Sequence, residues 1–95
     1  KGYLDAFRMA SFNRIPVKLE MTLRAKNLIV EEFPMAEKDI RKKGGRYIYE
    51  SYVAQMEGIG RFVCGLMDDI RIIDSPDLQE YLDGYFEKHM KKREV

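Results

Sequence analysis

The feature that most constrains the fold is a series of closely spaced structural signals over residues 57–85. Its first part repeats apolar side chains with the spacing of one helical face, at Ile59, Phe62, Val63 and Leu66. The β-branched run at residues 70–73 predicts a short strand. Ser75 and Pro76 predict the start of another helix, because serine can accept free backbone N–H groups and proline lacks a donor that would have no partner there. The stretch therefore predicts helix, strand and helix with almost no linker.

Residues 17–24 alternate strictly between apolar and polar side chains. The side chains expected to point inward are Val17, Leu19, Met21 and Leu23. Those expected to point outward are Lys18, Glu20, Thr22 and Arg24. This period predicts a strand with one buried and one solvated face.

The middle of the chain contains weaker signals. Residues 25–33 predict a short helix that Pro34 ends, because a residue before proline is steered out of the α region. Residues 37–41 predict a strand with Ile40 inward, and the adjacent glycines within residues 43–46 predict a hairpin turn.

Residues 47–54 predict the partner strand of that hairpin, but their period leaves the facing open. One alternative turns inward Tyr47, Tyr49, Ser51 and Val53. The other turns inward Ile48, Tyr52 and Ala54.

The expected order is strand, helix, strand, strand, helix, strand and a final helix. This is the split βαβ order of a ferredoxin-like α+β sandwich, in which right-handed crossovers place two helices on one face of a four-stranded antiparallel sheet. The extra C-terminal helix must then cover a sheet edge or a partner.

Composition argues against catalysis and against a membrane span. A chain of 95 residues with one histidine and one cysteine has no pair for a His-activated nucleophile and no multi-histidine metal site. We therefore expect no catalytic residue, metal or cofactor. The lone Cys64 fits a reducing cytoplasm, and no apolar run approaches the roughly 20 residues that cross a bilayer.

Two motifs suggest other kinds of binding site. The glycines of residues 58–60 suggest a phosphate loop, but the dinucleotide pattern needs a glycine where Val63 stands, so we expect close approach of helix and sheet instead. Tyr47, Tyr49 and Tyr52 occupy aromatic positions of an RRM strand that stacks single-stranded RNA. Glu50 would repel phosphate in that arrangement.

The phrase Arg61-Phe62-Val63-Cys64-Gly65 is followed by an acidic turn, an Ile-x-Ile strand and a Ser-Pro-x-Leu helix start. This order resembles the WCX module, the C-terminal extension of bacterial WYL-domain transcriptional regulators. The resemblance covers residues 16–95. Phrases within residues 7–15 resemble the end of a WYL barrel, so residues 1–15 are expected to be the trailing segment of a preceding WYL domain or a linker. A short helix packed on the domain is the alternative.

The resemblance implies a non-catalytic regulatory domain, preceded in its chain by a helix-turn-helix and a WYL domain. Such domains sense nucleic-acid or nucleotide-like effectors and help to form dimers. It also favours an inward Tyr49, with Ile48 and Tyr52 on the open sheet face. The candidate ligand or nucleic-acid contacts are Lys18, Arg24, Tyr52 and Arg61. Three alternatives remain open: a small-molecule-binding regulatory domain, an RRM-like single-stranded nucleic-acid-binding domain, and a stand-alone ferredoxin-like interaction domain that dimerises through its open sheet or last helix.

Overall fold

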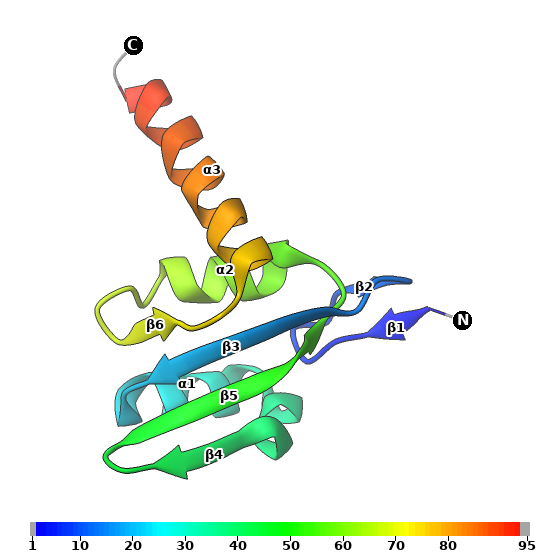
Figure 1. Cartoon of the computed structure of the whole chain (residues 1–95), viewed down its shortest axis with the longest axis vertical. Coiled ribbons are helices and arrows are strands. Elements are labelled where there is room, and N and C mark those ends of the chain that lie inside the picture. Colours follow the sequence, from blue (N-terminus) through cyan, green and yellow to red (C-terminus); the bar gives the residue numbers. More distant parts are fainter. Residues whose placement is uncertain (1, 94–95) are drawn as a thin grey trace.

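The computed structural model describes residues 2–93, so Lys1, Glu94 and Val95 lie outside the described residues. Figure 1 shows an α+β fold built on an antiparallel sheet with the strand order β4-β5-β3-β6. The strands of this sheet are β3 (Ile15–Met21), β4 (Ile40–Lys43), β5 (Arg46–Val53) and β6 (Ile70–Ile72). The helices are α1 (Leu23–Glu32), the 3-10 helix η1 (Pro34–Asp39), α2 (Met56–Cys64) and α3 (Pro76–Arg93). Two short strands, β1 (Tyr3–Leu4) and β2 (Ala10–Ser11), form a separate hairpin.

The register of β3 and β5 decides which face of β5 is buried. Leu19 pairs with Tyr49, and both side chains are 0% exposed. Tyr52, on the opposite face, is 47% exposed, which confirms the inward facing of Tyr49. Ile48 shares the face of Tyr52 but is only 3% exposed. Its lateral neighbours are Glu20 and Arg41, whose aliphatic stems can cover an apolar residue.

One apolar core joins the sheet to the helices. The sheet contributes Val17, Leu19, Met21, Tyr49 and Val53. The helices contribute Ala25 and Ile29 from α1, Ile59, Phe62 and Val63 from α2, and Leu78 and Leu82 from α3. Since α1 and α2 both bury their apolar residues in this one cluster, they share it with the inward face of β3 and β5.

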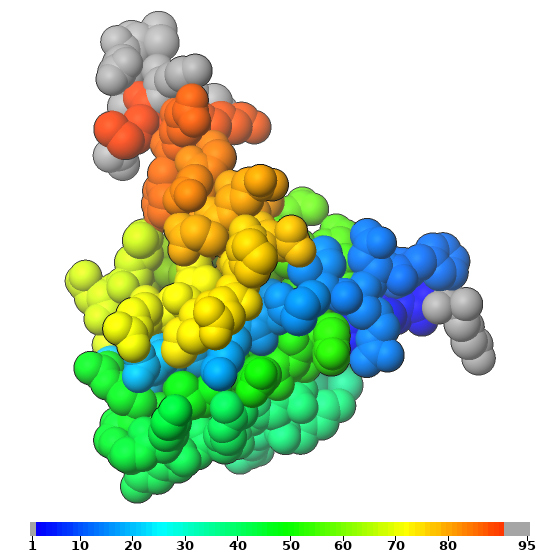
Figure 2. Space-filling view, viewed as in Figure 1, coloured from blue at the N-terminus to red at the C-terminus, as the bar shows by residue number. Residues whose placement is uncertain are grey.

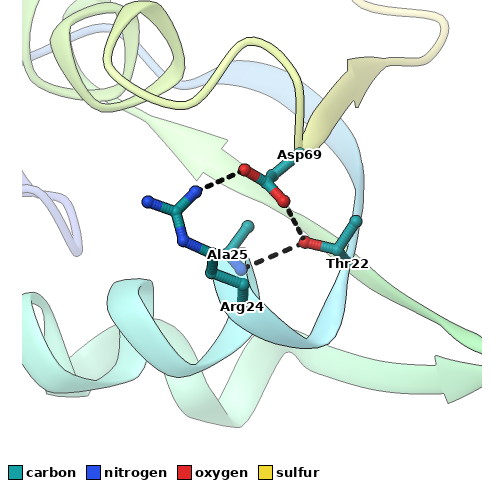
Figure 3. Close-up of polar contacts among 4 residues, drawn as sticks. All are labelled: Thr22, Arg24, Ala25 and Asp69. Carbon is teal, nitrogen blue, oxygen red and sulfur yellow. Dashed lines mark hydrogen bonds and ion pairs between the residues drawn. The ribbon is translucent and has the colours of Figure 1, made fainter.

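The strand predicted over residues 17–24 ends earlier, at Met21, and the prediction is wrong for its last residues. Thr22 is the N-cap of α1, and its hydroxyl accepts the Ala25 N–H at 3.3 Å (Figure 3). The same hydroxyl donates to the Asp69 carboxylate at 2.9 Å. Arg24 therefore lies in the first turn of α1 and not on the outward face of β3. Because Thr22 caps α1 and is held by the Asp69 carboxylate, β3 ends at Met21 although the alternating pattern continues.

Between the first helix and the hairpin, the predicted strand over residues 37–41 is also wrong in its first part. Residues up to Asp39 form η1, with Pro34 at its first position, and β4 begins at Ile40. Proline is favoured at the first position of a helix because its φ is already suitable there. The hairpin turn after β4 is confirmed, with Gly44 at a φ of 61°.

The N-terminal segment is a β-hairpin packed on the domain, and the alternative of a short helix is wrong. Phe7 is 2% exposed, and its ring centroid lies 4.8 Å from that of Phe33. Asp5 is 1% exposed, and one carboxylate oxygen accepts the N–H groups of Phe7 and Met9 at 2.8 and 2.9 Å. Its other oxygen accepts the Ala54 N–H at 2.8 Å. Phe7 therefore belongs to the same core, with Ala6 and Met9 packed against it, while Arg8 stays exposed.

Candidate binding surfaces

Within residues 2–93, no cluster of His, Cys, Asp or Glu side chains is arranged to hold a metal ion. No helix in the same part of the chain has the length and apolarity needed to cross a membrane. Burial raises the pKa of the Cys64 thiol, which disfavours the reactive thiolate at neutral pH. The structure presents three candidate binding surfaces: one face of the sheet, a groove beside α2, and the outer half of α3.

The open sheet face is the side of the sheet turned away from the core. Its residues are Pro16, Lys18, Glu20, Arg41, Lys43, Arg46, Ile48, Glu50, Tyr52 and Arg71. Two ion pairs cross it. A guanidinium nitrogen of Arg41 lies 2.9 Å from a carboxylate oxygen of Glu50, and one of Arg71 lies 2.7 Å from a carboxylate oxygen of Glu20. The Arg41 hydrogen bond, helped by the charge of Lys18, lowers the pKa of Glu50. The remaining cations of this face make no ion pair within the described residues, so the face carries excess positive charge.

Tyr52 is held at one end of the open sheet face. The Arg14 guanidinium lies 5.1 Å from the centre of the Tyr52 ring and 4.7 Å from that of Tyr3. The Tyr3 hydroxyl donates to the Tyr52 carbonyl at 3.0 Å. Arg14 thus lies within cation–π distance of two rings, which fixes Tyr52 without removing it from solvent.

Lys18 and Tyr52 line the same hollow, which has a volume of about 200 Å³. Ligand pockets usually measure roughly 300–1,000 Å³, so this hollow is too small to enclose a nucleotide. Glu50 and Asp74 line it as well. It is therefore a shallow contact point of mixed charge.

The structure does not bring the four predicted contact residues together. Lys18 and Tyr52 share the hollow on the open sheet face. Arg24 lies at the start of α1, where its guanidinium pairs with Asp69 at 2.6 Å (Figure 3). Arg61 is exposed on α2 and lines a different groove. Two of the four candidates therefore lie outside any site built on the sheet.

Two of the three tyrosines expected of an RRM strand lie on the inward face of β5. Tyr49 is fully buried, and Tyr47 shares its face. Burial raises the pKa of Tyr49 to about 12. Among residues 2–93 its hydroxyl makes no hydrogen bond of acceptable geometry; Ser51, whose contact partly offsets the raised pKa, donates to Asp39 at 2.9 Å. Only Tyr52 of the three remains free to stack a base.

The groove beside α2, which we call the aromatic groove, has a volume of about 540 Å³. It lies between α1, α2 and the loop of residues 7–9. Gly58 allows that loop to approach, since a Cβ there would lie 2.7 Å from the Cβ of Phe7. The predicted close approach at this glycine is therefore real, but the element that approaches is the N-terminal loop and not the sheet.

The outer half of α3, residues 85–90, extends away from the rest of the molecule (Figures 1 and 2). The apolar face of α3 has helical spacing, at Leu78, Tyr81, Leu82, Tyr85, Phe86, His89 and Met90. Leu78 and Leu82 are buried, whereas Tyr85 is 40% and Met90 is 62% exposed. The inner half of α3 is anchored on α2, where a Cβ on Gly60 would lie 2.7 Å from the Tyr81 ring. The outer half continues the same face: Phe86 still packs against the core, whereas Tyr85 and Met90 have little cover in the described part of the chain.

The helical spacing of apolar residues predicted the apolar face of α3, but the sequence did not show how much of that face is buried. The aromatic groove was missed, because its lining comes from residues far apart in sequence. Comparisons with protein-family models, curated proteins and solved structures give no match to this chain.

Proposed function

We propose that residues 16–95 form a ferredoxin-like domain of the WCX type, the non-catalytic C-terminal regulatory domain of a bacterial transcriptional regulator. The chain order β3-α1-β4-β5-α2-β6 and the sheet order β4-β5-β3-β6 support this topology. A helix-turn-helix domain and a WYL domain then precede it in the same protein, in the cytoplasm. We assign residues 1–15 to the trailing segment of that WYL domain, whose Phe7 and Asp5 are buried against this one.

The observation that carries the proposal is the outer half of α3. An 18-residue helix spans about 27 Å at the usual rise of 1.5 Å per residue. Its first turns bury Leu78 and Leu82, but the apolar face continues through Tyr85 and Met90. Tyr85 stacks on Tyr81 and contacts His89, with ring centroids 6.4 and 4.2 Å apart. A continuous aromatic face on a projecting helix suits docking, and we assign it to a second copy of the chain.

Dimerisation through α3 provides a way to regulate the attached DNA-binding domains. A ligand that binds one dimer arrangement better than another shifts their populations, and the attached DNA-binding domains follow. We assign the contact with an anionic, nucleotide-like effector to Lys18 and Tyr52 on the open sheet face. Arg24 is left out of that contact because Asp69 already pairs with its guanidinium.

Sedimentation velocity of the 95-residue chain tests the dimer. We expect a concentration-dependent dimer that Tyr85→Glu and Met90→Glu each convert to a monomer, since a buried carboxylate without a partner is costly. Met35→Glu is the matched control, because Met35 is 54% exposed on η1, away from α3. A chain that stays monomeric at its solubility limit contradicts the dimer, as does a dimer that survives both α3 substitutions.

Titration with a single-stranded DNA oligonucleotide tests the effector surface. Lys18→Ala should weaken binding and reduce its salt dependence, because fewer counterions are then released. Tyr52→Ala should weaken binding through lost stacking. Arg24→Ala should leave both quantities unchanged. Equal affinities for all three variants and the unaltered chain would remove Lys18 and Tyr52 from the site.

A further inference from the structure

The aromatic groove combines an apolar floor with a size suited to a small ligand. Its floor is formed by Phe7, Leu28, Phe33, Phe62 and Leu66. The Phe33 ring centroid lies 4.8 Å from that of Phe7 and 6.0 Å from that of Phe62. A volume of about 540 Å³ falls in the range of roughly 300–1,000 Å³ typical of ligand pockets. The groove therefore has room for one apolar body of modest size.

One guanidinium is fixed at the rim by the loop of residues 7–9. Arg8 adopts a φ of 64°, a left-handed conformation that is strained for a residue with a Cβ. Its guanidinium donates to the Glu32 carbonyl at 3.0 Å and lies 5.2 Å from the centre of the Phe33 ring. The Arg8 N–H donates to the Asp5 carbonyl at 3.1 Å, which closes the loop. The fold thus holds a positive charge directly over an aromatic wall of the groove.

A second guanidinium comes from α2. Arg61 is exposed, lines the same groove and forms no ion pair with a described carboxylate. Among the described residues, Glu32 is the only acidic one that lines the groove. Two arginines against one carboxylate leave one excess positive charge beside the apolar floor. Arginine suits a carboxylate because its planar fork can donate two parallel hydrogen bonds.

We propose that the aromatic groove binds a small amphiphilic monoanion, with its apolar body on the phenylalanine floor and its carboxylate between Arg8 and Arg61. The groove is separate from the open sheet face and from α3, so this site does not depend on the proposed function. It gives Arg61 a ligand of a different chemical class from the nucleotide-like effector. It also accounts for the strained Arg8, whose backbone conformation aims a charge at the groove.

Amide NMR titration of the intact chain with three matched probes tests the site. The probes are 4-phenylbutyrate, the neutral 4-phenylbutan-1-ol with the same apolar body, and acetate with the charge alone. We expect 4-phenylbutyrate to shift amides of residues 7–9, 28–33 and 58–66. The alcohol should bind about tenfold more weakly, the factor that one lost charge-assisted hydrogen bond produces. Acetate should cause no shift in these amides.

Substitution of the two arginines at the rim of the aromatic groove tests whether they bind the carboxylate. Arg8→Gln and Arg61→Gln should each lower the affinity for 4-phenylbutyrate toward that of the alcohol. Arg24→Gln is the matched control, because this guanidinium pairs with Asp69 outside the groove. Arg61 is exposed on α2, so its substitution tests the rim even if Arg8→Gln fails to fold. The proposal is overturned by shifts located elsewhere, by equal affinities for acid and alcohol, by unchanged binding in both folded rim variants, or by no binding of 4-phenylbutyrate.

Discussion

The buried carboxylate of Asp5 gives the sharpest test of how the N-terminal segment joins the domain. It accepts three backbone N–H groups, from Phe7, Met9 and Ala54, at 2.8 to 2.9 Å. The bonds to Phe7 and Ala54 are buried, whereas the bond to Met9 is partly exposed. In Asp5→Ala, water can reach the Met9 donor, but two donors remain buried without an acceptor. At ~1–3 kcal/mol for each orphaned donor, the variant should lose ~2–6 kcal/mol of unfolding free energy.

Asp5→Asn replaces one carboxylate oxygen and keeps the other as an acceptor. The amide oxygen can still accept from Phe7 and Met9, but the amide nitrogen then faces the Ala54 N–H, donor against donor. Two buried donors then lack an acceptor, the Ala54 N–H and the new side-chain amide nitrogen, so the expected cost is ~2–6 kcal/mol, comparable to that of the alanine variant. Small domains have total stabilities of ~5–15 kcal/mol, so both losses are measurable.

Urea unfolding followed by circular dichroism measures both variants, with the midpoint and the slope fitted together. Asp68→Ala is the control, because Asp68 is exposed and forms no ion pair with a described residue. If both Asp5 variants unfold within ~0.5 kcal/mol of this control, the usual range of surface substitutions, the N-terminal segment is not integral to the core. The described packing of residues 5–9 would then be wrong.

Three further predictions concern single side chains. Tyr49→Phe should raise the unfolding free energy by ~1 kcal/mol in thermal or urea unfolding, because it removes a buried hydroxyl that has no hydrogen-bond partner among the described residues; a loss of unfolding free energy would show that the hydroxyl does have a partner. Thr22→Ala should cost ~1–2 kcal/mol through loss of the cap and the Asp69 contact, while Thr22→Ser should retain most of it. The pKa of Glu50, followed by carboxyl NMR, should rise toward its ordinary value in Arg41→Gln. The pKa of Glu50 is lower in the folded state than in the unfolded state. Its contribution to stability is therefore present above the unfolded pKa and is lost as the pH falls through the folded pKa. If the pKa of Glu50 is the same in Arg41→Gln as in the unaltered chain, Arg41 does not lower it.

Local spacing was sufficient to predict most of the helices and strands. Alternation predicted the inward face of β3, and the adjacent glycines at Gly44 predicted the turn into β5. Pro76 predicted the start of α3. Each of these signals depends on neighbours within a few residues, so the chain carries it before any tertiary contact forms.

Tertiary contacts decided where β3 ends and which candidate residues share a surface. Thr22 caps α1 with support from Asp69, 47 positions away, and this moved Arg24 off the sheet. Packing of both helices on one core placed Arg61 in a groove apart from Lys18 and Tyr52.

The sequence by itself determined the local elements and the buried face of β3. Only the tertiary structure decided that the N-terminal segment belongs to the core and that an aromatic groove exists at all. The Asp5 bond to Ala54 joins residues 49 positions apart, and the groove lining comes from three separate segments. Periodicity reports which side of an element is apolar. It does not report which distant side chain meets that face, because that depends on how all the elements pack at once.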